Sequence, residues 1–364
     1  MKVFLKAYLE KNLGDDLFVY IIANRYNKTE FTAFSYEEYG KLSDNLIIKS
    51  NPRIRLFIRL INKLIRELNF NNYIVPENLY KRDKDILIHI GGSLFCEKNN
   101  MKYWRNTLEL EYYKCNLKYY ILGSNFGPYK NDEFVTLMNE FFSKAEDVCF
   151  REEYSYNLFK NLPNVRYASD IVFTLNTSDI KIINSKKVIM SVVDCGRKAK
   201  QEYKELYENK IIEMSRYFIK NGYEVTLMSY CKAEKDEEAI ESILAKCDSK
   251  LKEKINTYYY RGNIEEALNV MGDCQIVVGT RFHANIIGLL LGKTIIPIAY
   301  SDKTINVLKD MNFNGRVLKV QDIDKFDVNS LTEEDLNYKH DISFQIKDAQ
   351  KQFEKLDELL NKDD

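Results

Sequence analysis

Residues 275–303 read QIVVGTRFHANIIGLLLGKTIIPIAYSDK, and the class of the fold follows from this stretch. A short apolar run ends at Gly279, a longer apolar run follows, and the β-branched run TIIPIAY comes next. Short β-branched runs that alternate with longer helical ones are typical of strand–helix–strand units around a parallel sheet. The stretch therefore predicts an α/β protein.

The same alternation extends toward the N-terminus in two series. In the nearer series we expect strands at residues 188–193, 224–228, 257–260 and 275–278, with helices at 201–221, 236–247 and 264–272. In the farther series we expect strands at residues 3–8, 86–90, 119–122 and 148–150, each followed by a helical run. Two such series predict two doubly wound domains.

The length of 364 residues also fits two domains. Polar residues concentrate in NTSDIKIINSKK, residues 176–187, so we expect the join there. We predict Rossmann-like domains over residues 1–180 and 187–320 that face a central ligand cleft. The remaining segment, residues 321–364, should end in a helix over 342–361 that crosses back onto the first domain.

Charge and cysteine usage exclude several classes of function. The 54 Lys and Arg residues equal the 54 Asp and Glu residues, so no net field draws the whole protein to nucleic acid. The seven cysteines contain no C-x-x-C pair and are odd in number, which favours reduced thiols over disulfides or a zinc site. We therefore expect a cytoplasmic protein with no nucleic-acid partner and no metal.

Membrane contact is restricted by the sequence to the surface of a bilayer. The N-terminus lacks the apolar core of a signal peptide, and the most apolar stretch, residues 284–300, is interrupted by Lys293 and Pro297. Residues 51–72 predict a helix with a strongly basic face, which is ordinarily a solvated surface. The alternative is that this face meets an anionic acceptor or the inner face of the membrane, so peripheral attachment stays open.

The clearest candidate chemistry lies where the strand of residues 275–278 ends. Arg281 and His283 stand at the start of the following apolar helix, where cations oppose the helix dipole. Such an arrangement favours a bound phosphate or carboxylate between the cations and the helix. The alternative is that Arg281 pairs with a nearby acid and His283 is a capped core histidine. Lys303, after the run TIIPIAY, is a weaker candidate for the same site.

Loops after two earlier strands bring backbone close to the expected ligand. The strand of residues 86–90 is followed by Gly91, Gly92 and Ser93, and the strand of residues 119–122 by GSNFGP, which contains Asn125. Glycine permits close approach of a ligand to the main chain, although a glycine pair after a strand is common. These residues are therefore candidates for contact with the ligand that occupies the cleft.

Two further charged residues stand next to predicted helices. Asp15 in the NLGDD loop is either a helix cap or a functional carboxylate. Arg151 follows a strand directly and either holds a carboxylate of the substrate or pairs with Glu152. His89 lies within an apolar strand and His340 in a polar tail, so His283 is the histidine placed for catalysis.

Six blocks taken together resemble the polysaccharide pyruvyltransferase family. They are NLGDD (12–16), IHIGGSLF (88–95), ILGSNFGPY (121–129), AEDVCFREEYS (145–155), ASDIVF (168–173) and GTRFHANIIGLLLGKTIIPIAYSDK (279–303). The resemblance covers residues 10–315 and is most specific in its last block. It implies two domains arranged as in GT-B glycosyltransferases, an acceptor side in the first domain and a donor side in the second.

The resemblance also implies a reaction and roles for the candidates. The donor would be phosphoenolpyruvate, the acceptor a glycan or lipid-linked glycan, and the product a pyruvate ketal in cell-surface or exopolysaccharide biosynthesis. His283 would carry the proton, while Arg281, Arg151 and Lys303 would bind the donor, without any cofactor. Ser93, the pair Ser124-Asn125 and Phe282 depart from the usual residues of the family.

Two other functions compete with this one. A GT-B glycosyltransferase with a nucleotide-sugar donor would have the same fold, since fold alone does not fix the donor. Such sites commonly hold the ribose with a carboxylate, yet no Glu occurs between Glu266 and Glu333, which favours the smaller donor. A scaffold without activity would leave the pairing of Arg281 with His283 at a helix start unexplained.

Overall fold

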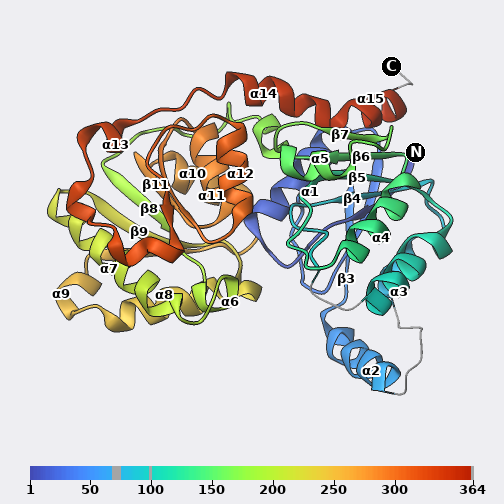
Figure 1. Cartoon of the computed structure of the whole chain (residues 1–364), viewed down its shortest axis with the longest axis horizontal. Helices are drawn as coiled ribbons and strands as arrows, with labels where there is room; N and C mark the ends of the chain where they lie inside the picture. Colours follow the sequence, from blue (N-terminus) through green and yellow to red (C-terminus); the bar gives the residue numbers. More distant parts are fainter. Residues whose placement is uncertain (68–74, 98–100, 362–364) are drawn as a thin grey trace. The chain divides into compact units, whose positions relative to one another are not determined.

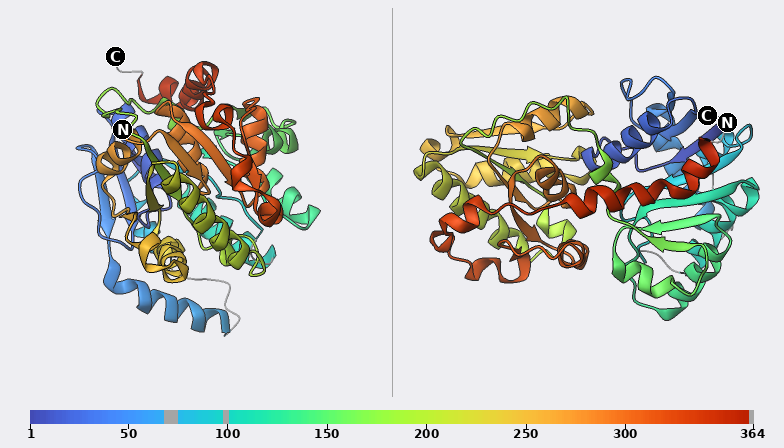
Figure 2. Two further views of the ribbon diagram at one scale, coloured as in Figure 1. Left: turned by 90° about the vertical axis from the view of Figure 1, so that its left-hand side faces the viewer. Right: turned by 90° about the horizontal axis from the view of Figure 1, so that it is seen from above.

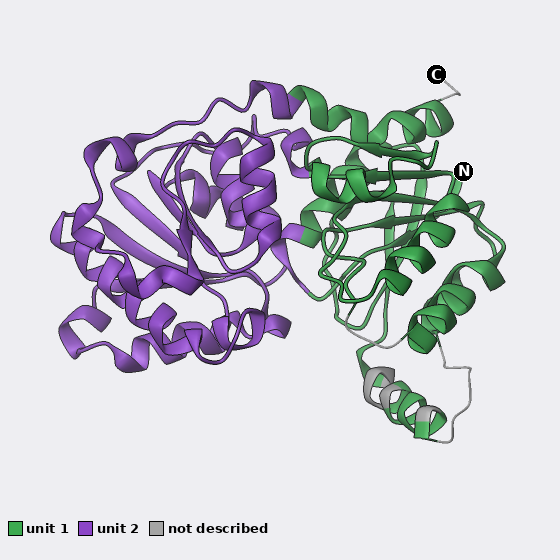
Figure 3. Cartoon of the chain, viewed as in Figure 1, with its two compact units in different colours: residues 1–10, 15–171, 347–364 green, residues 11–14, 172–346 purple. Residues whose placement is uncertain are grey.

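The computed structural model describes residues 1–67, 75–97 and 101–361. The chain divides into two compact units (Figure 3). Unit 1 contains Met1–Glu10, Asp15–Ile171 and Lys347–Asp364, and unit 2 contains Lys11–Gly14 and Val172–Ile346. Within the described residues, no helix is both long enough and apolar enough to cross a bilayer.

The division after Ile171 comes earlier in the chain than the polar stretch 176–187, in which the sequence places the join. That stretch is held by unit 2: the N–H of Ile183 donates to the carbonyl of Gly272 (3.1 Å), and the N–H of Ser185 donates to the carbonyl of Asp273 (3.1 Å). Its polar residues therefore bond to the second unit instead of forming a free linker.

Unit 1 is built on a seven-stranded sheet with the order β3-β2-β1-β4-β5-β6-β7, in which every pair is parallel. The strands are β1 (Lys2–Lys6), β2 (Glu30–Ser35), β3 (Leu46–Ser50), β4 (Ile86–Ile90), β5 (Lys118–Ser124), β6 (Asp147–Phe150) and β7 (Val165–Tyr167). The strand order reverses between β1 and β4, and ligands of such sheets bind beyond the carboxyl ends of the strands at this point. The predicted class is confirmed for this unit.

The helices of unit 1 alternate with these strands (Figure 1). They are α1 (Leu13–Arg25), α2 (Arg55–Glu67), α3 (Met101–Glu111), α4 (Asp132–Ser143) and α5 (Glu153–Phe159). The predicted helix 51–72 corresponds to α2 and the 3-10 turn Pro52–Ile54 before it, and residues 68–72 lie outside the described residues. Phenylalanines fill the core around α4 and β6; Phe142, for example, lies edge-on to Phe150 and Phe159.

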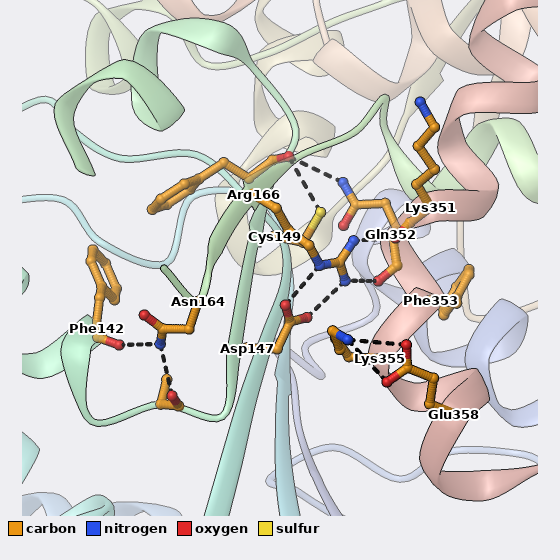
Figure 4. Close-up of polar contacts among 12 residues, drawn as sticks. Phe142, Asp147, Cys149, Asn164, Arg166, Lys351, Gln352, Phe353, Lys355 and Glu358 are labelled. Carbon is orange, nitrogen blue, oxygen red and sulfur yellow. Dashed lines mark hydrogen bonds and ion pairs between the residues drawn. The ribbon is translucent and has the colours of Figure 1, made fainter. Parts of the chain in front are cut away.

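The C-terminal segment completes unit 1. Its helices are α14 (Ser343–Ala349) and α15 (Glu354–Leu360), joined by the 3-10 turn Gln350–Phe353. Arg166, at β7, forms a bidentate pair with Asp147 of β6 at 2.7 Å and also donates to the carbonyl of Gln352 at 2.7 Å (Figure 4). The Gln352 side chain accepts from the N–H of Gly123 (3.0 Å) and donates to the carbonyl of Ala168 (2.8 Å). The segment therefore satisfies buried groups of the sheet.

Unit 2 is built on a six-stranded parallel sheet with the order β10-β9-β8-β11-β12-β13. Its strands are β8 (Lys187–Ser191), β9 (Glu224–Ser229), β10 (Ile255–Tyr259), β11 (Ile276–Gly279), β12 (Thr294–Ala299) and β13 (Leu318–Lys319). Its helices are α6 (Cys195–Lys198), α7 (Tyr203–Lys220), α8 (Asp236–Lys246), α9 (Ser249–Lys252), α10 (Ile264–Gly272), α11 (Phe282–Leu290), α12 (Asp302–Asp310) and α13 (Glu333–Asn337). Figure 2 shows the strands and helices of each unit from two further sides.

The core of unit 2 explains its near-continuous apolar strands. Val188, Val225 and Ile276 face a cluster that includes Tyr207 and Phe218 of α7. The alternate residues face the other side, where the backbone of Gly288 in α11 lies against Val277 and Ile295. Both faces of the sheet are thus covered, as parallel sheets require, and the strand ends are left to form the site.

Candidate functional site

The loop between β11 and α11 is held in one conformation by buried side chains of unit 2. Ser191, at the end of β8, accepts from the N–H of Thr280 (2.9 Å) and of Arg281 (3.0 Å). Asn285 donates to the carbonyl of Gly279 (2.9 Å), and a Cβ atom on Gly279 would collide with the Asn285 amide. The sequence therefore needs glycine at the strand end, and the loop starts from a rigid anchor.

Arg281 is buried in this loop and is held by two carboxylates of its own unit. Its Nε donates to Asp236 Oδ2 at 3.0 Å, and its Nη atoms pair with Asp236 Oδ1 and with Glu234. Asp236 Oδ2 also accepts from the N–H groups of Tyr230 and Cys231, both at 2.9 Å. The acid-pairing alternative for Arg281 is therefore correct, and its contact with a donor stays a prediction.

Further cations collect around Glu234 and Tyr300. Lys198, at the end of α6, lies 2.6 Å from Glu234, and Lys303 Nζ lies 5.7 Å from the centre of the Tyr300 ring. Burial alone would raise the pKa of Glu234, but Arg281 and Lys198 outweigh it and lower that pKa to about 2. Burial likewise opposes ionisation of Tyr300, yet Lys303, Arg281 and Lys198 together lower its pKa. Both shifts have a common cause, the positive charges of Arg281 and Lys198, to which Lys303 adds at Tyr300.

The charges of this cluster do not cancel. Lys198, Arg281 and Lys303 carry three positive charges, whereas Glu234 and Asp236 carry two negative ones. Arg281 donates to both carboxylates and Lys198 pairs with Glu234, so these five residues together carry one excess positive charge. The N–H groups at the helix start add to the positive potential there. The arrangement can therefore bind a small, strongly negative ligand.

His283 occupies the first turn of α11, beside this cluster in the sequence. Its ring packs on the backbone of Gly14, where a Cβ atom would overlap the imidazole Nδ1. Gly14 belongs to unit 2 because the N–H of Leu13 donates to the carbonyl of Tyr230 (3.1 Å) and Asn12 bridges to Cys231. The NLGDD loop and the helix that carries His283 thus meet, which explains the glycine of the first block.

The candidates of unit 1 also gather at one place. Arg151 is buried, donating to Asp170 Oδ2 at 2.8 Å and to Asn125 Oδ1 at 3.1 Å. A Cβ atom on Gly92 would lie only 2.7 Å from the Arg151 guanidinium, so the guanidinium stacks on this glycine. Ser93 Oγ lies 3.3 Å from Asn125 Oδ1. Three loops that the sequence analysis treats separately therefore form one cluster.

Gly91 and Asp15 adjoin this cluster. Gly91 has a φ of 154°, and a Cβ atom on it would lie 3.6 Å from an Asp15 carboxylate oxygen. The alternative partner predicted for Arg151, Glu152, instead accepts from Ser155 Oγ at 2.6 Å. Unit 1 thus brings together Asp15, Gly91, Gly92, Ser93, Asn125 and Arg151, whereas Arg281, His283 and Lys303 belong to unit 2.

Sequence reasoning missed the carboxylates and the phenol of both clusters. Asp236 opens α8 and looks like an ordinary first-turn acid, while Asp170 lies in the quoted block ASDIVF without a role. Tyr300 ends an apolar run and looks like a core residue. The available signal was that a buried arginine requires a buried anion, since unpaired charges are not buried. No group of three or more His, Cys, Asp or Glu residues in the described part of the chain could hold a metal.

Comparisons with known proteins agree with this architecture. The chain is 24% identical over 319 residues to the amylovoran biosynthesis protein AmsJ of Erwinia amylovora, covering 78% of this chain and 74% of that protein. Among solved structures, it resembles Anabaena HepE in complex with UDP and glucose, with a TM-score of 0.55 and 12% identity over 99% of both chains. It also resembles the UDP-GlcNAc 2-epimerase of Methanocaldococcus jannaschii, with a TM-score of 0.56 and 11% identity over 99% of both chains.

These structural likenesses show the fold alone: two parallel-sheet α/β units of GT-B type. The family follows from the sequence itself, because residues 12–302 match the family described as polysaccharide pyruvyl transferase. The matched region contains the candidate residues from Asp15 to His283, and Lys303 follows it directly. The chain therefore belongs to the polysaccharide pyruvyl transferase family, a family of transferases.

Proposed function

We propose that the protein transfers the pyruvyl group of phosphoenolpyruvate to a glycan and forms a pyruvate ketal in the synthesis of a cell-surface polysaccharide. The observation that carries the proposal is the cluster of Lys198, Arg281 and Lys303 around Tyr300 and Glu234. Its net positive charge suits a donor that carries both a phosphate and a carboxylate. Membership in the family and the likeness to AmsJ support the same reaction and a polysaccharide product.

In this proposal the residues of unit 2 divide the work. Lys303, Lys198 and the N–H groups at the start of α11 bind the anionic groups of the donor. Arg281 adds positive charge and, through Asp236, fixes the loop that presents them. His283 delivers the proton, since an imidazole exchanges protons near neutral pH.

The proposed reaction needs no cofactor or metal. His283 protonates the methylene carbon, and the oxygen of one sugar hydroxyl attacks the resulting cationic C2 while its proton returns to His283. The C2–phosphate bond then breaks, and the phosphate leaves with the electron pair. The second hydroxyl attacks C2 and passes its proton to the phosphate, which gives the ketal and inorganic phosphate.

The residues of unit 1 serve the acceptor in this proposal. Ser93 and the peptide groups of Gly91 and Gly92 offer hydrogen bonds to sugar hydroxyls, and Asp15 offers a carboxylate. Arg151, for which the family resemblance implies contact with the donor, is engaged by Asp170 and Asn125. Its proposed contribution is to hold the loops of Gly92 and Asn125 in place, alongside any contact with the donor.

A donor screen by thermal unfolding tests the proposal. Phosphoenolpyruvate should raise the melting temperature, because binding at a hundredfold excess over Kd stabilises by about 2.7 kcal/mol. UDP-, GDP- and CMP-sugars should have no such effect. Lys303→Ala should abolish the response to phosphoenolpyruvate and leave the melting temperature of the free protein unchanged. A shift with a nucleotide sugar alone would assign the protein to glycosyl transfer instead.

A further inference from the structure

Helix α2 exposes one apolar side to solvent. Phe57, Leu60 and Leu64 are 63%, 54% and 56% exposed, and their spacing places them on one side of the helix. Among the side chains of this helix that the structure describes, Ile58 is the buried one, at 8% exposure. We name Phe57, Leu60 and Leu64 the α2 apolar face. Among the described residues, no other helix exposes three large apolar side chains.

The rest of α2 is strongly basic. Residues 52–67 contain five basic residues and one acidic residue, although the whole chain has equal numbers of both. At helical spacing, positions 59 and 66 fall on the side opposite to positions 57, 60 and 64, and position 63 lies between the two sides. Lys63 is exposed, and its partner Glu67, 3.8 Å away, is exposed as well. Arg53 is exposed too, and these two cations are therefore available to an external anion.

Figure 1 shows where this helix lies in unit 1. It follows β3, the edge strand of the sheet, and stands away from α3 and α4, which pack near the other strands. Exposed apolar surface of this size and regularity is costly in water and usually marks an interaction site. The question is which kind of partner fits an apolar face bordered by cations.

We propose that α2 binds the surface of an anionic membrane, with the α2 apolar face in the acyl boundary and the basic side among the lipid headgroups. Helices with Phe and Leu on one side and Lys and Arg on the other lie in the interface plane of bilayers. The basic side selects anionic lipids, because each cation near such a surface adds attraction. An apolar groove of a protein would bury the apolar face equally well, but it would provide no anionic groups for the cations of α2. The proposal goes beyond the proposed function and does not rest on it.

Vesicle co-sedimentation of the full chain tests this proposal without substrate. The protein should sediment with vesicles of phosphatidylcholine mixed with phosphatidylglycerol and not with vesicles of phosphatidylcholine alone. The triple variant Phe57→Ser, Leu60→Ser, Leu64→Ser should bind at least about tenfold more weakly, because it removes most of the inserted apolar area. The double variant Arg53→Gln, Lys63→Gln should lose about fivefold for each cation removed.

A matched control removes the same number of exposed apolar side chains elsewhere. Leu79, Ile183 and Phe344 are 67%, 49% and 65% exposed, and their replacement by Ser should leave vesicle binding unchanged. Orientation is tested with Phe57→Trp and Arg66→Trp, after subtraction of the signal of Trp104. Brominated lipid should quench the indole at position 57 and not the one at position 66.

Three results would overturn the proposal. The first is an absence of binding to anionic vesicles by folded wild-type protein, and the second is undiminished binding by the triple variant. The third is self-association of the wild type that the triple variant abolishes, since this would assign the face to a second copy of the chain. None of these results depends on the donor, so they leave the proposed transfer reaction unaffected.

Discussion

Gln in place of His283 tests the proton carrier at the scale of a single residue. The amide keeps the shape of the ring edge but cannot take up and release a proton near neutral pH, so donor binding should persist while turnover falls about 10²- to 10⁴-fold. Calorimetric titration with phosphoenolpyruvate and a phosphate-release assay separate the two effects. His340→Gln is the matched control. Gly14→Ala should also lower turnover, because its methyl group displaces the imidazole; wild-type turnover in His283→Gln would remove His283 from the mechanism.

Arg281→Ala should destabilise unit 2 as well as disturb the site. Asp236 is fully buried, and removal of its partner leaves an uncompensated carboxylate, which costs about 3–5 kcal/mol. Urea unfolding measures the loss, and Asp236→Asn in the same chain should recover most of it. Arg261→Ala, which breaks an exposed pair with Glu237, should cost less than about 1 kcal/mol. An unchanged urea midpoint in Arg281→Ala would show that the pair contributes nothing to stability.

The lowered pKa of Glu234 predicts that the free energy of unfolding depends on pH. Its pKa is lowered to about 2 in the folded protein from an ordinary value of 4.5, so the folded state favours the ionised form. The stabilisation, about 3 kcal/mol, is fully present above pH 4.5 and is lost as the pH falls toward 2. Glu234→Gln should therefore be less stable than wild type at pH 7, and the difference should shrink between pH 4.5 and 2. The exposed substitution Glu253→Gln should show no such trend.

At the scale of elements, replacement of Gln352 tests how much the C-terminal segment contributes to the stability of unit 1. Leu in its place fills a similar volume but leaves the N–H of Gly123 and the carbonyl of Ala168 without their partner. Each unsatisfied buried group costs about 1–3 kcal/mol. Hydrogen exchange should therefore speed up in β5 and β6 of the Gln352→Leu variant, while α7 and β8 keep their protection. Equal exchange rates in both proteins would show that these bonds are dispensable.

The elements that the sequence predicts best are those with two covered faces. The predicted strand 86–90 coincides with β4, and the predicted helix 264–272 coincides with α10, because buried strands read as continuous apolar runs and α10 has a clear helical period. The sequence does not predict strands β2, β3, β7 and β13. β3 is half-exposed at the edge, and β7 has three residues, so neither produces an apolar run.

The sequence predicts the candidate site only in part, because local patterns reveal some of its residues and not their distant partners. Arg281 and His283 stand out because cations at a helix start contradict a local rule. Their partners obey local rules: Asp236 looks like a normal first-turn acid, and Gly14 looks like a normal turn residue. Asp236 contacts Arg281, which lies 45 residues further along the sequence, and Gly14 contacts His283 over a much longer separation. No local pattern encodes such contacts.

At the scale of the whole molecule, the assignment of the donor to unit 2 predicts which backbone amides exchange more slowly when the donor is bound. If phosphoenolpyruvate binds the cationic cluster, the amides at the start of α11 and α12 in unit 2 should exchange more slowly in its presence. Amides in the loops of Gly92 and Asn125 in unit 1 should change less. Hydrogen exchange by mass spectrometry with and without phosphoenolpyruvate measures both. Protection confined to unit 1 would move the donor to Arg151.

Because residues 347–364 belong to unit 1, synthesis of the chain fixes the order in which the two units can be completed. During translation, every strand of unit 1 leaves the ribosome before unit 2, yet Arg166, Gly123 and Ala168 receive their bonds to Gln352 only after residues 172–346 have been made. While residues 172–346 are synthesised, the nascent unit 1 lacks the hydrogen bonds to Gln352. The unit whose strands are synthesised first is thus the last to be completed.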